Sequence, residues 1–349
     1  MKARRWDGTA MRIALIGCGN WGANHARTLA QLGVLAAVGD REGARADALA
    51  DALGCMVAAP DEILADPGID GVVLALAPEA HVAACVAALE AGKHVLVEKP
   101  MALDTAGAEA IVAAARAAGT VAMTGHLLRF NPAFRTLEQL VAAGRLGRLR
   151  HVRAVRTGLG KFFSGADAMW DMAPHDLSMV LALAGEAAEG VASERLRLVG
   201  EQVDAAHLAL RFPSGLVAQV DVSRLAPERV RRLSVVGTQG MAVFDDLAPP
   251  GRRLVLYPHR VWREDGGIRH AAGTAEAPEI DDSPPLAAEL GHFIDCIATG
   301  TAPRASVREG LDILRLLAVA ERSPDMALSR CSNDGAGTGQ QEQSWASPS

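Results

Sequence analysis

Short apolar runs alternate with longer alanine-rich stretches through the first third of the chain, and this alternation constrains the fold more than any other feature. Residues 12–16, 34–40, 55–58, 71–77, 94–98 and 121–124 are predicted strands, and residues 21–32, 42–53, 79–91 and 104–118 are predicted helices. Strands that alternate with helices pair in parallel, because each helix is the crossover that returns the chain to the same end of the sheet. We therefore predict an α/β fold with a doubly wound parallel sheet in residues 11–125.

The pattern changes after Arg129. Alternating apolar and polar side chains, which are typical of antiparallel strands with one wet face, occupy residues 149–157, 196–199, 207–211, 216–222, 232–236, 241–244 and 254–257. Helices are predicted at residues 132–143, 286–298 and 307–320. These elements predict a C-terminal α+β domain, residues 126–322, with a large open, mostly antiparallel sheet. Because an open sheet leaves one face to be covered, we expect a homodimer or homotetramer that forms through this sheet.

The two ends of the chain lack an apolar pattern. Residues 1–10 are charged, so we expect a disordered leader, and Met11 is either an alternative start or the end of that leader. Residues 323–349 are rich in Gly, Gln and Ser, which predicts a disordered tail.

Composition narrows the classes of partner. The chain has 35 Lys and Arg against 41 Asp and Glu, a net charge of −6, which gives no general attraction to nucleic acid or to an anionic membrane. It contains no apolar run of about 18 residues, so we expect a cytoplasmic protein with no membrane partner. Its 5 cysteines are scattered without a Cys-x-x-Cys pair, which argues against a disulfide framework or a structural zinc site and for reduced, mostly buried thiols.

A glycine-rich turn lies between the first predicted strand and the first predicted helix. Gly17, Gly19 and Gly22 have the spacing Gly-x-Gly-x-x-Gly, with Asn20 and Trp21 between the last two. In a dinucleotide site the first glycine permits the tight turn, the second lets the backbone approach a pyrophosphate, and the third lets helix and strand pack closely. The N–H groups at the helix start would face the phosphates. The turn therefore predicts a Rossmann-type cofactor site.

The second predicted strand ends in an acid, Asp40, 18 residues after Gly22. A carboxylate there can accept hydrogen bonds from the adenosine ribose hydroxyls and disfavours a 2′-phosphate, which favours NAD. Arg41 keeps NADP open as the alternative, because a guanidinium can pair with a 2′-phosphate or lie over the adenine ring. Asp40 could also simply cap the next helix.

Two further motifs carry chemistry. Glu98, Lys99 and Pro100 follow one another at the end of a predicted strand, and Asp171 precedes His175 by four residues, so both can share one face in the first turn of a helix. Pro174 is expected in that first turn, where its missing N–H is tolerated. Taken alone, the lysine could be a solvated surface residue, and the aspartate and histidine could be a helix-capping pair, with Asp176 equally able to partner the histidine.

With the glycine turn, these motifs over residues 11–321 resemble the Gfo/Idh/MocA oxidoreductases, the glucose-fructose oxidoreductase and inositol dehydrogenase family. The resemblance implies a Rossmann domain followed by a domain with a large open sheet. It places Lys99 beside the nicotinamide and the substrate hydroxyl, makes His175 the acid/base, and gives Asp171 a supporting role. It also implies that Glu98 holds the lysine or lines the cofactor pocket, and that the bond before Pro100 is cis.

Other residues are expected to border the same cleft. On the cofactor side these are Ala77, Pro78 and His81. On the substrate side they are His126, Arg129, Lys161 and Trp170. The remaining histidines show no ligand spacing, so no metal is predicted.

The function predicted is that of an NAD(P)-dependent oxidoreductase that interconverts a secondary alcohol and a ketone on a small carbohydrate-like molecule: a sugar, a cyclitol or a nucleotide sugar. The alternative is a non-catalytic dinucleotide-binding sensor or regulator on the same scaffold. A third reading keeps the enzyme class with a non-sugar carbonyl or an aromatic diol as substrate.

Overall fold

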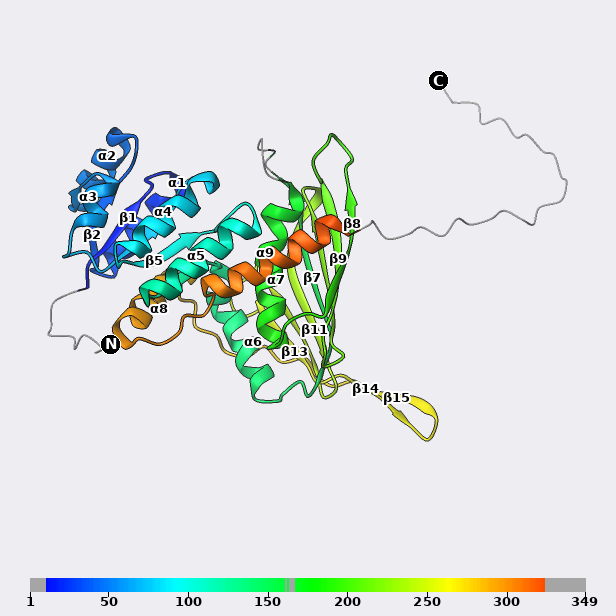
Figure 1. Cartoon of the computed structure of the whole chain (residues 1–349). Helices are drawn as coiled ribbons and strands as arrows, with labels where there is room; N and C mark the ends of the chain where they lie inside the picture. The colour runs from blue at the N-terminus through cyan, green and yellow to red at the C-terminus, as the bar shows by residue number, and fades with distance from the viewer. Residues whose placement is uncertain (1–10, 161, 163–166, 324–349) are drawn as a thin grey trace, which may run out of the picture.

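The computed structural model describes residues 11–160, 162 and 167–323, which form two sheets with their helices (Figure 1). The predicted leader, most of the predicted tail and Lys161 lie outside the described residues. One sheet belongs to the N-terminal half of the chain and the other to the C-terminal half.

The N-terminal sheet is parallel throughout, which confirms the doubly wound prediction. Its strands run in the order β3-β2-β1-β4-β5-β6 and are β1 (Ile13–Ile16), β2 (Leu35–Gly39), β3 (Met56–Val57), β4 (Gly71–Leu74), β5 (His94–Glu98) and β6 (Ala122–Gly125). The helices that accompany it are α1 (Asn20–Gln31), α2 (Gly43–Leu53), α3 (Pro60–Ala65), α4 (Pro78–Glu90) and α5 (Thr105–Ala118). Strands β1 and β4 are buried along their whole length, as a sheet covered on both faces requires.

The C-terminal sheet is mostly antiparallel, as predicted, with one parallel pair between β7 and β10. Its order is β13-β12-β11-β7-β10-β9-β8, and its strands are β7 (Leu149–Leu159), β8 (Gly190–Leu196), β9 (Ala205–Arg211), β10 (Val217–Ser223), β11 (Leu225–Gly237), β12 (Met241–Asp245) and β13 (Leu254–Tyr257). Helices α6 (Pro132–Ala142), α7 (Ala168–Ala184) and α9 (Val307–Arg322) lie on one face, and Figure 1 shows no described helix on the other.

Several local elements differ from the prediction. The strand expected at residues 196–199 is wrong, because β8 ends at Leu196 and the backbone N–H groups of Leu198 and Val199 turn to bond the Asp204 carboxylate. The short helices α3 and η1 (Leu127–Phe130) were not predicted, since six or four residues carry too little periodicity. A hairpin of β14 (Arg260–Glu264) and β15 (Gly267–Ala271) was also missed, and it projects from the body (Figure 1).

Two helices from the end of the chain, α8 (Pro285–Thr299) and α9, pack against the N-terminal half. Helix α8 comes late in the sequence but lies against α1, and its Leu290 and Phe293 join the core that contains Ile13 and Leu15. Helix α9 packs along α5 and also against α7. The two halves of the chain are therefore packed directly against each other.

Among the described helices, none combines the length and the apolar character that a membrane crossing needs. The described cysteines Cys18, Cys85 and Cys296 are buried and Cys55 is partly so, all with free thiols. Burial raises the pKa of Cys18 to about 11 and that of Cys85 to about 12, so both stay protonated at neutral pH.

Candidate active site

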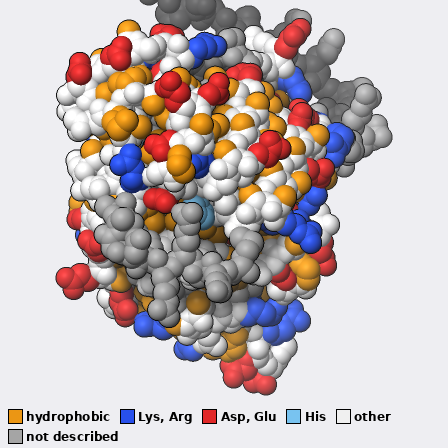
Figure 2. Space-filling view, turned by 60° about the vertical axis from the view of Figure 1, so that its left-hand side comes forward, with side chains coloured by type: hydrophobic (Ala, Val, Ile, Leu, Met, Phe, Trp, Pro, Cys, Tyr) orange, Lys and Arg blue, Asp and Glu red, His pale blue; other side chains and the backbone are white. Residues whose placement is uncertain are grey.

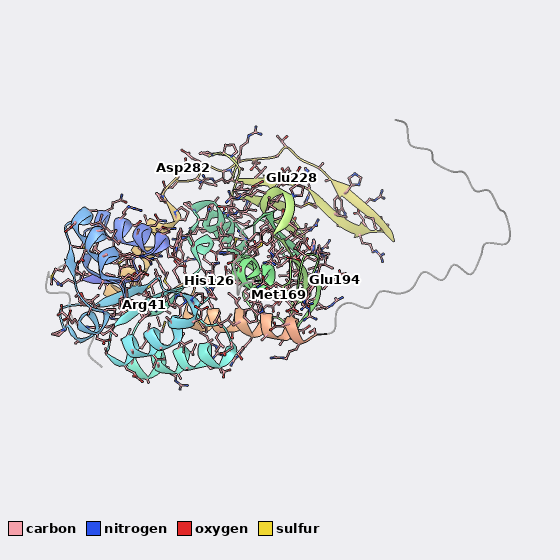
Figure 3. The ribbon with its side chains drawn as sticks, turned by 90° about the horizontal axis from the view of Figure 1, so that it is seen from above. Arg41, His126, Met169, Glu194, Glu228 and Asp282 are labelled. Carbon is pink, nitrogen blue, oxygen red and sulfur yellow. The ribbon has the colours of Figure 1, made fainter. Side chains whose placement is uncertain are left out.

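A cavity of about 490 Å³ opens at the carboxyl ends of β4, β5 and β6, where residues from both halves meet. Figure 3 shows this region from above, with His126 where the two halves meet and Arg41 on the N-terminal half. The carboxyl edge of a parallel sheet is where ligands of doubly wound folds bind. The lining residues are Trp21, Ala75, Leu76, Pro78, Glu98, Lys99, Gly125, Leu127, Leu128, Arg156, His175 and Arg231.

The glycine turn beside this cavity has the geometry of a dinucleotide cradle. Gly17 has φ +103°, and a Cβ there would lie 2.3 Å from the Ala75 carbonyl oxygen. A Cβ on Gly22 would lie 1.8 Å from the carbonyl oxygen of Gly17, so the first and third glycines allow close backbone packing. A Cβ on Gly19 would meet nothing within 4 Å, so this glycine faces open space at the N-terminus of α1. Room and free N–H groups at this point fit a pyrophosphate.

These contacts predict that two glycine-to-alanine substitutions in the turn affect different properties, one the stability and the other the binding of NAD. We expect Gly22→Ala to lower the free energy of unfolding by about 1–3 kcal/mol, because its methyl group overlaps the backbone of the turn. We expect Gly19→Ala to unfold normally but to bind NAD at least about tenfold more weakly, because its methyl group points to where a phosphate would lie. Thermal unfolding and calorimetric NAD titration measure the two effects. Equal losses of stability in both variants would contradict this reading of the turn.

Asp40 follows β2 and ties the glycine turn to the next helix. Its Oδ2 accepts a hydrogen bond from the Cys18 N–H at 2.6 Å, and its Oδ1 accepts one from the Glu42 N–H at 2.8 Å. The N-cap residue of α2 is Glu42, so Asp40 bonds the backbone just before this helix and is not its cap. A carboxylate offers about four acceptor sites, which leaves two for ribose hydroxyls. Arg41 beside it is exposed.

Glu98 lies at the end of β5 and is the centre of a buried network. Its Oε1 accepts a hydrogen bond from the Trp21 indole N–H and lies 2.7 Å from His25 Nε2, while Oε2 accepts one from the Lys99 N–H at 3.1 Å. Burial alone would raise the pKa of Glu98, but its contacts with His25, Trp21 and the Lys99 N–H together hold the pKa below its ordinary value of 4.5. The network fixes the backbone that carries Lys99. Sequence analysis missed His25, whose only signal is its place three residues after Gly22.

Lys99 reaches across the cavity to the C-terminal half. Its Nζ lies 2.7 Å from Asp171 Oδ1 and donates to the Asp171 carbonyl at 3.3 Å. The lysine side chain is only 21% exposed, so it is not a freely solvated surface group. The Lys99–Pro100 peptide bond is cis, as the resemblance implied.

His175 lies on α7 and lines the same cavity as Lys99. Its Nδ1 is buried and has no hydrogen-bond partner among the described residues. Burial, with the nearby charges of Lys99 and Arg156, lowers the pKa of His175 well below 6.5, so the imidazole is neutral at pH 7. Asp171 pairs with the lysine, and Asp176 pairs with Arg156 at 2.6 and 3.2 Å.

Helix α7 begins earlier than predicted. Asp167 caps it by accepting the Trp170 N–H at 2.8 Å, so the helix starts at Ala168. Pro174 therefore lies inside the helix and not in its first turn, which corrects that expectation. Asp171 is in the first turn, and His175 follows one turn later.

The remaining predicted residues divide between the cavity and its surroundings. Pro78 lines the cavity, Ala77 is the N-cap residue of α4, and the His81 ring bonds the Pro100 carbonyl at 2.8 Å. Trp170 is half-buried against an apolar core that contains residues of both halves, and it is not among the lining residues.

His126 and Arg129 are buried behind the cavity wall. In the part of the chain that the structure describes, neither His126 ring nitrogen has a hydrogen-bond partner, and burial, with Arg129 nearby, lowers the pKa of His126 to about 3. Arg129 pairs with Glu138 and Glu309 at 3.4 and 3.3 Å. Neither residue is among those that line the cavity.

Two charged lining residues were absent from the predicted site: Arg156 of β7 and Arg231 of β11. The only sequence signal was a basic residue at an inward position of each strand, which does not reveal that the two strands are neighbours.

Among the described residues, no group of three or more His, Cys, Asp or Glu is placed to hold a metal ion. The face in Figure 2 shows acidic and basic side chains interspersed rather than gathered by sign.

A parallel sheet with a glycine cradle at its carboxyl edge, and a lysine and a histidine in the adjoining cavity, define the class of NAD-binding oxidoreductases. The family model described as "Oxidoreductase family, NAD-binding Rossmann fold" matches residues 11–126, and the GFO/IDH/MocA C-terminal domain matches residues 134–243. The chain belongs to the Gfo/Idh/MocA family of oxidoreductases.

Individual relatives span nearly the whole chain. UDP-N-acetylglucosamine 3-dehydrogenase of Acidithiobacillus ferrooxidans is 32% identical over 89% of this chain and 95% of its own length. Myo-inositol 2-dehydrogenase of Thermotoga maritima is 29% identical over 90% of this chain and 96% of its own. The solved structure of the first enzyme superposes with a TM-score of 0.77 over 90% of this chain and 98% of that one, at 30% identity.

Proposed function

We propose that this oxidoreductase interconverts a secondary alcohol and a ketone on a sugar, a cyclitol or a nucleotide sugar, with Lys99 and His175 assisting hydride transfer. The observation that carries the proposal is that both side chains line one cavity at the carboxyl edge of the Rossmann sheet, beside the glycine cradle. The relatives support the substrate class, since their names include an inositol dehydrogenase and a nucleotide-sugar dehydrogenase.

In the direction of oxidation, the substrate carbinol lies between the two side chains. The neutral imidazole of His175 accepts the hydroxyl proton, for which its lowered pKa keeps it in the basic form. The Lys99 ammonium stabilises the negative charge that grows on the same oxygen. NAD supplies the hydride acceptor when it is bound. In the direction of reduction, the protonated imidazole returns the proton to the carbonyl oxygen.

Asp171 and Glu98 act as positioning residues in this proposal. Asp171 holds the ammonium at 2.7 Å from the C-terminal side, and Glu98 holds the Lys99 backbone from the N-terminal side. A group held from both halves keeps its geometry only while the halves stay packed, which suits a reacting site that must be pre-organised. The glycine cradle, Trp21 and Asp40 are proposed to contact the cofactor.

The prediction of a homodimer or homotetramer through the C-terminal sheet also stays a proposal. The outer face of that sheet carries the exposed or half-buried side chains of β7, β9 and β10, including the Arg153–Asp221–His207 contacts at 3.0 and 2.8 Å. Sedimentation velocity gives the oligomeric state directly. A monomer across a wide concentration range would contradict the proposal.

The test of the function is a substrate panel with both nicotinamide cofactors. Purified protein with NAD or NADP is mixed with sugars, cyclitols and nucleotide sugars, and absorbance at 340 nm reports hydride transfer. We expect turnover on at least one carbohydrate and a preference for NAD over NADP. Tight NAD binding without turnover on any of them would overturn the proposal and favour the regulator alternative.

A further inference from the structure

We infer that the substrate carries an oxyanion, a carboxylate or a phosphate, which Arg231 and Arg156 hold at the C-terminal wall of the cavity. This inference rests on the proposed function and narrows its substrate class, because free cyclitols and neutral sugars lack such a group. Its starting point is a pair of like charges that face each other on two neighbouring strands of the sheet.

Arg156 and Arg231 lie directly opposite each other on neighbouring strands. The register of the antiparallel pair β7–β11 places Arg231 against Arg156. Like charges that face each other across two strands destabilise a sheet. Both residues are on the inner face, in step with the buried Ala154 on β7 and Leu233 on β11, so the outside solvent screens them less than surface arginines.

The two guanidiniums retain unused hydrogen-bond donors. Arg156 is 6% exposed and gives its Nε and Nη2 to Asp176. Among the described residues Arg231 makes one ion pair, from Nη1 to Asp246 Oδ2 at 3.3 Å, and Asp246 also accepts a hydrogen bond from the Asn131 amide at 3.0 Å. Each guanidinium has five N–H donors in a planar fork, so several remain on both residues. A forked set of donors matches the paired oxygens of a carboxylate or a phosphate.

Their place in the cavity assigns this anion to the substrate. Both arginines line the same 490 Å³ cavity as Lys99 and His175. One small molecule can therefore place its reacting carbon beside Lys99 and His175 and its anionic group beside the arginines. The cofactor phosphates have a separate place at the N-terminus of α1, next to Gly19. Among the described residues that line the cavity, Glu98 is the only acidic one, and its carboxylate already bonds Trp21, His25 and the Lys99 N–H.

Arg231 is the better of the two for mutation. Loss of Arg156 would leave the buried Asp176 carboxylate without its charge partner, which commonly costs about 3–5 kcal/mol of stability. Loss of Arg231 leaves Asp246 with its bond from Asn131. The matched control is Arg232, which is next in sequence, lies on the opposite face of the strand, and pairs with Asp245 at 2.7 Å.

The experiment measures binding to the NAD-loaded protein by calorimetry, with glucose and myo-inositol as neutral probes. Glucuronate tests a carboxylate, glucose 6-phosphate tests a phosphomonoester, and UDP-N-acetylglucosamine tests a diphosphate. We expect at least one anionic probe to bind about 10- to 100-fold more tightly than the neutral probes. Arg231→Gln should remove most of that preference, whereas Arg232→Gln should keep it. Which anionic probe binds tells the carboxylate from the phosphate.

The outcomes separate this inference from the proposed function. Equal binding of anionic and neutral probes by the unmodified protein, or equal effects of Arg231→Gln and Arg232→Gln, would overturn the oxyanion site. If neutral sugars are turned over at 340 nm in that case, the proposed function survives without it. If Arg231→Gln fails to fold, Arg231→Lys replaces it. We expect this variant to prefer anionic over neutral probes less strongly than the unmodified protein does, but still to prefer them. If Arg231→Lys and the unmodified protein show the same preference, the role of the forked guanidinium is overturned.

Discussion

Lys99→Met is expected to lower kcat by about 10²–10³-fold on the best substrate of the panel. The substitution keeps an unbranched side chain one atom shorter than lysine but removes the ammonium that would stabilise charge on the reacting oxygen. Binding of NAD should change little, because the glycine cradle is formed by other residues. Steady-state rates at 340 nm and a calorimetric NAD titration measure the two quantities.

Arg315→Met is the matched control for Lys99→Met. It also breaks an ion pair, between Arg315 and Glu109 at 2.8 Å, but one that is exposed and joins α9 to α5 outside the cavity. We expect this variant to keep the unmodified kcat. An equal loss in both variants would show that ion pairs between elements matter in general. Full activity of Lys99→Met would exclude the proposed role of the lysine.

His175→Asn is expected to lower kcat by about 10²–10⁴-fold, because no neutral base would remain to take the hydroxyl proton. The amide keeps a polar group of similar size in the cavity. The control is His270→Asn on the exposed strand β15, which should leave the rate unchanged.

The pH profile separates a proton-transfer role of His175 from a structural one. Its pKa lies well below 6.5, so the imidazole stays in the basic form as the pH falls through 6.5. The rate of oxidation by the unmodified protein should therefore hold through this range and fall only at lower pH, where the imidazole becomes protonated. In His175→Asn this acidic limb should disappear. A limb at or above pH 6.5, or the same limb in the variant, would contradict the assignment.

Sequence analysis predicted the parts of the site that lie in short local motifs at the ends of strands. The glycine turn, Asp40 and the Glu98-Lys99-Pro100 run each lie at the end of a strand, and the carboxyl ends of parallel strands meet at one edge of the sheet. Local pattern and topology therefore suffice to bring them together. The parallel sheet was predictable for the same reason, since a predicted helix follows each of β1, β2, β4 and β5.

The parts that were missed depend on pairing between distant segments. The buried contact of His25 with Glu98 joins positions 73 residues apart, and Arg231 meets Arg156 only through the register of β7 and β11. A strand's own residues do not determine which strand it pairs with. The start of α7 was misplaced for a smaller reason: Pro174 suggested a first turn, but the Asp167 cap set the start at Ala168.

Helix α8 makes the nucleotide-binding half discontinuous along the chain. Leu290 and Phe293 complete an apolar core whose other members come mainly from the first 130 residues. During synthesis the ribosome releases the whole second sheet before it releases α8, so that core stays open to water until the chain is nearly finished. In a chimera that exchanges the N-terminal halves of two relatives, the matching α8 therefore has to be exchanged as well. Otherwise the N-terminal core will pack against an α8 whose side chains do not fit it.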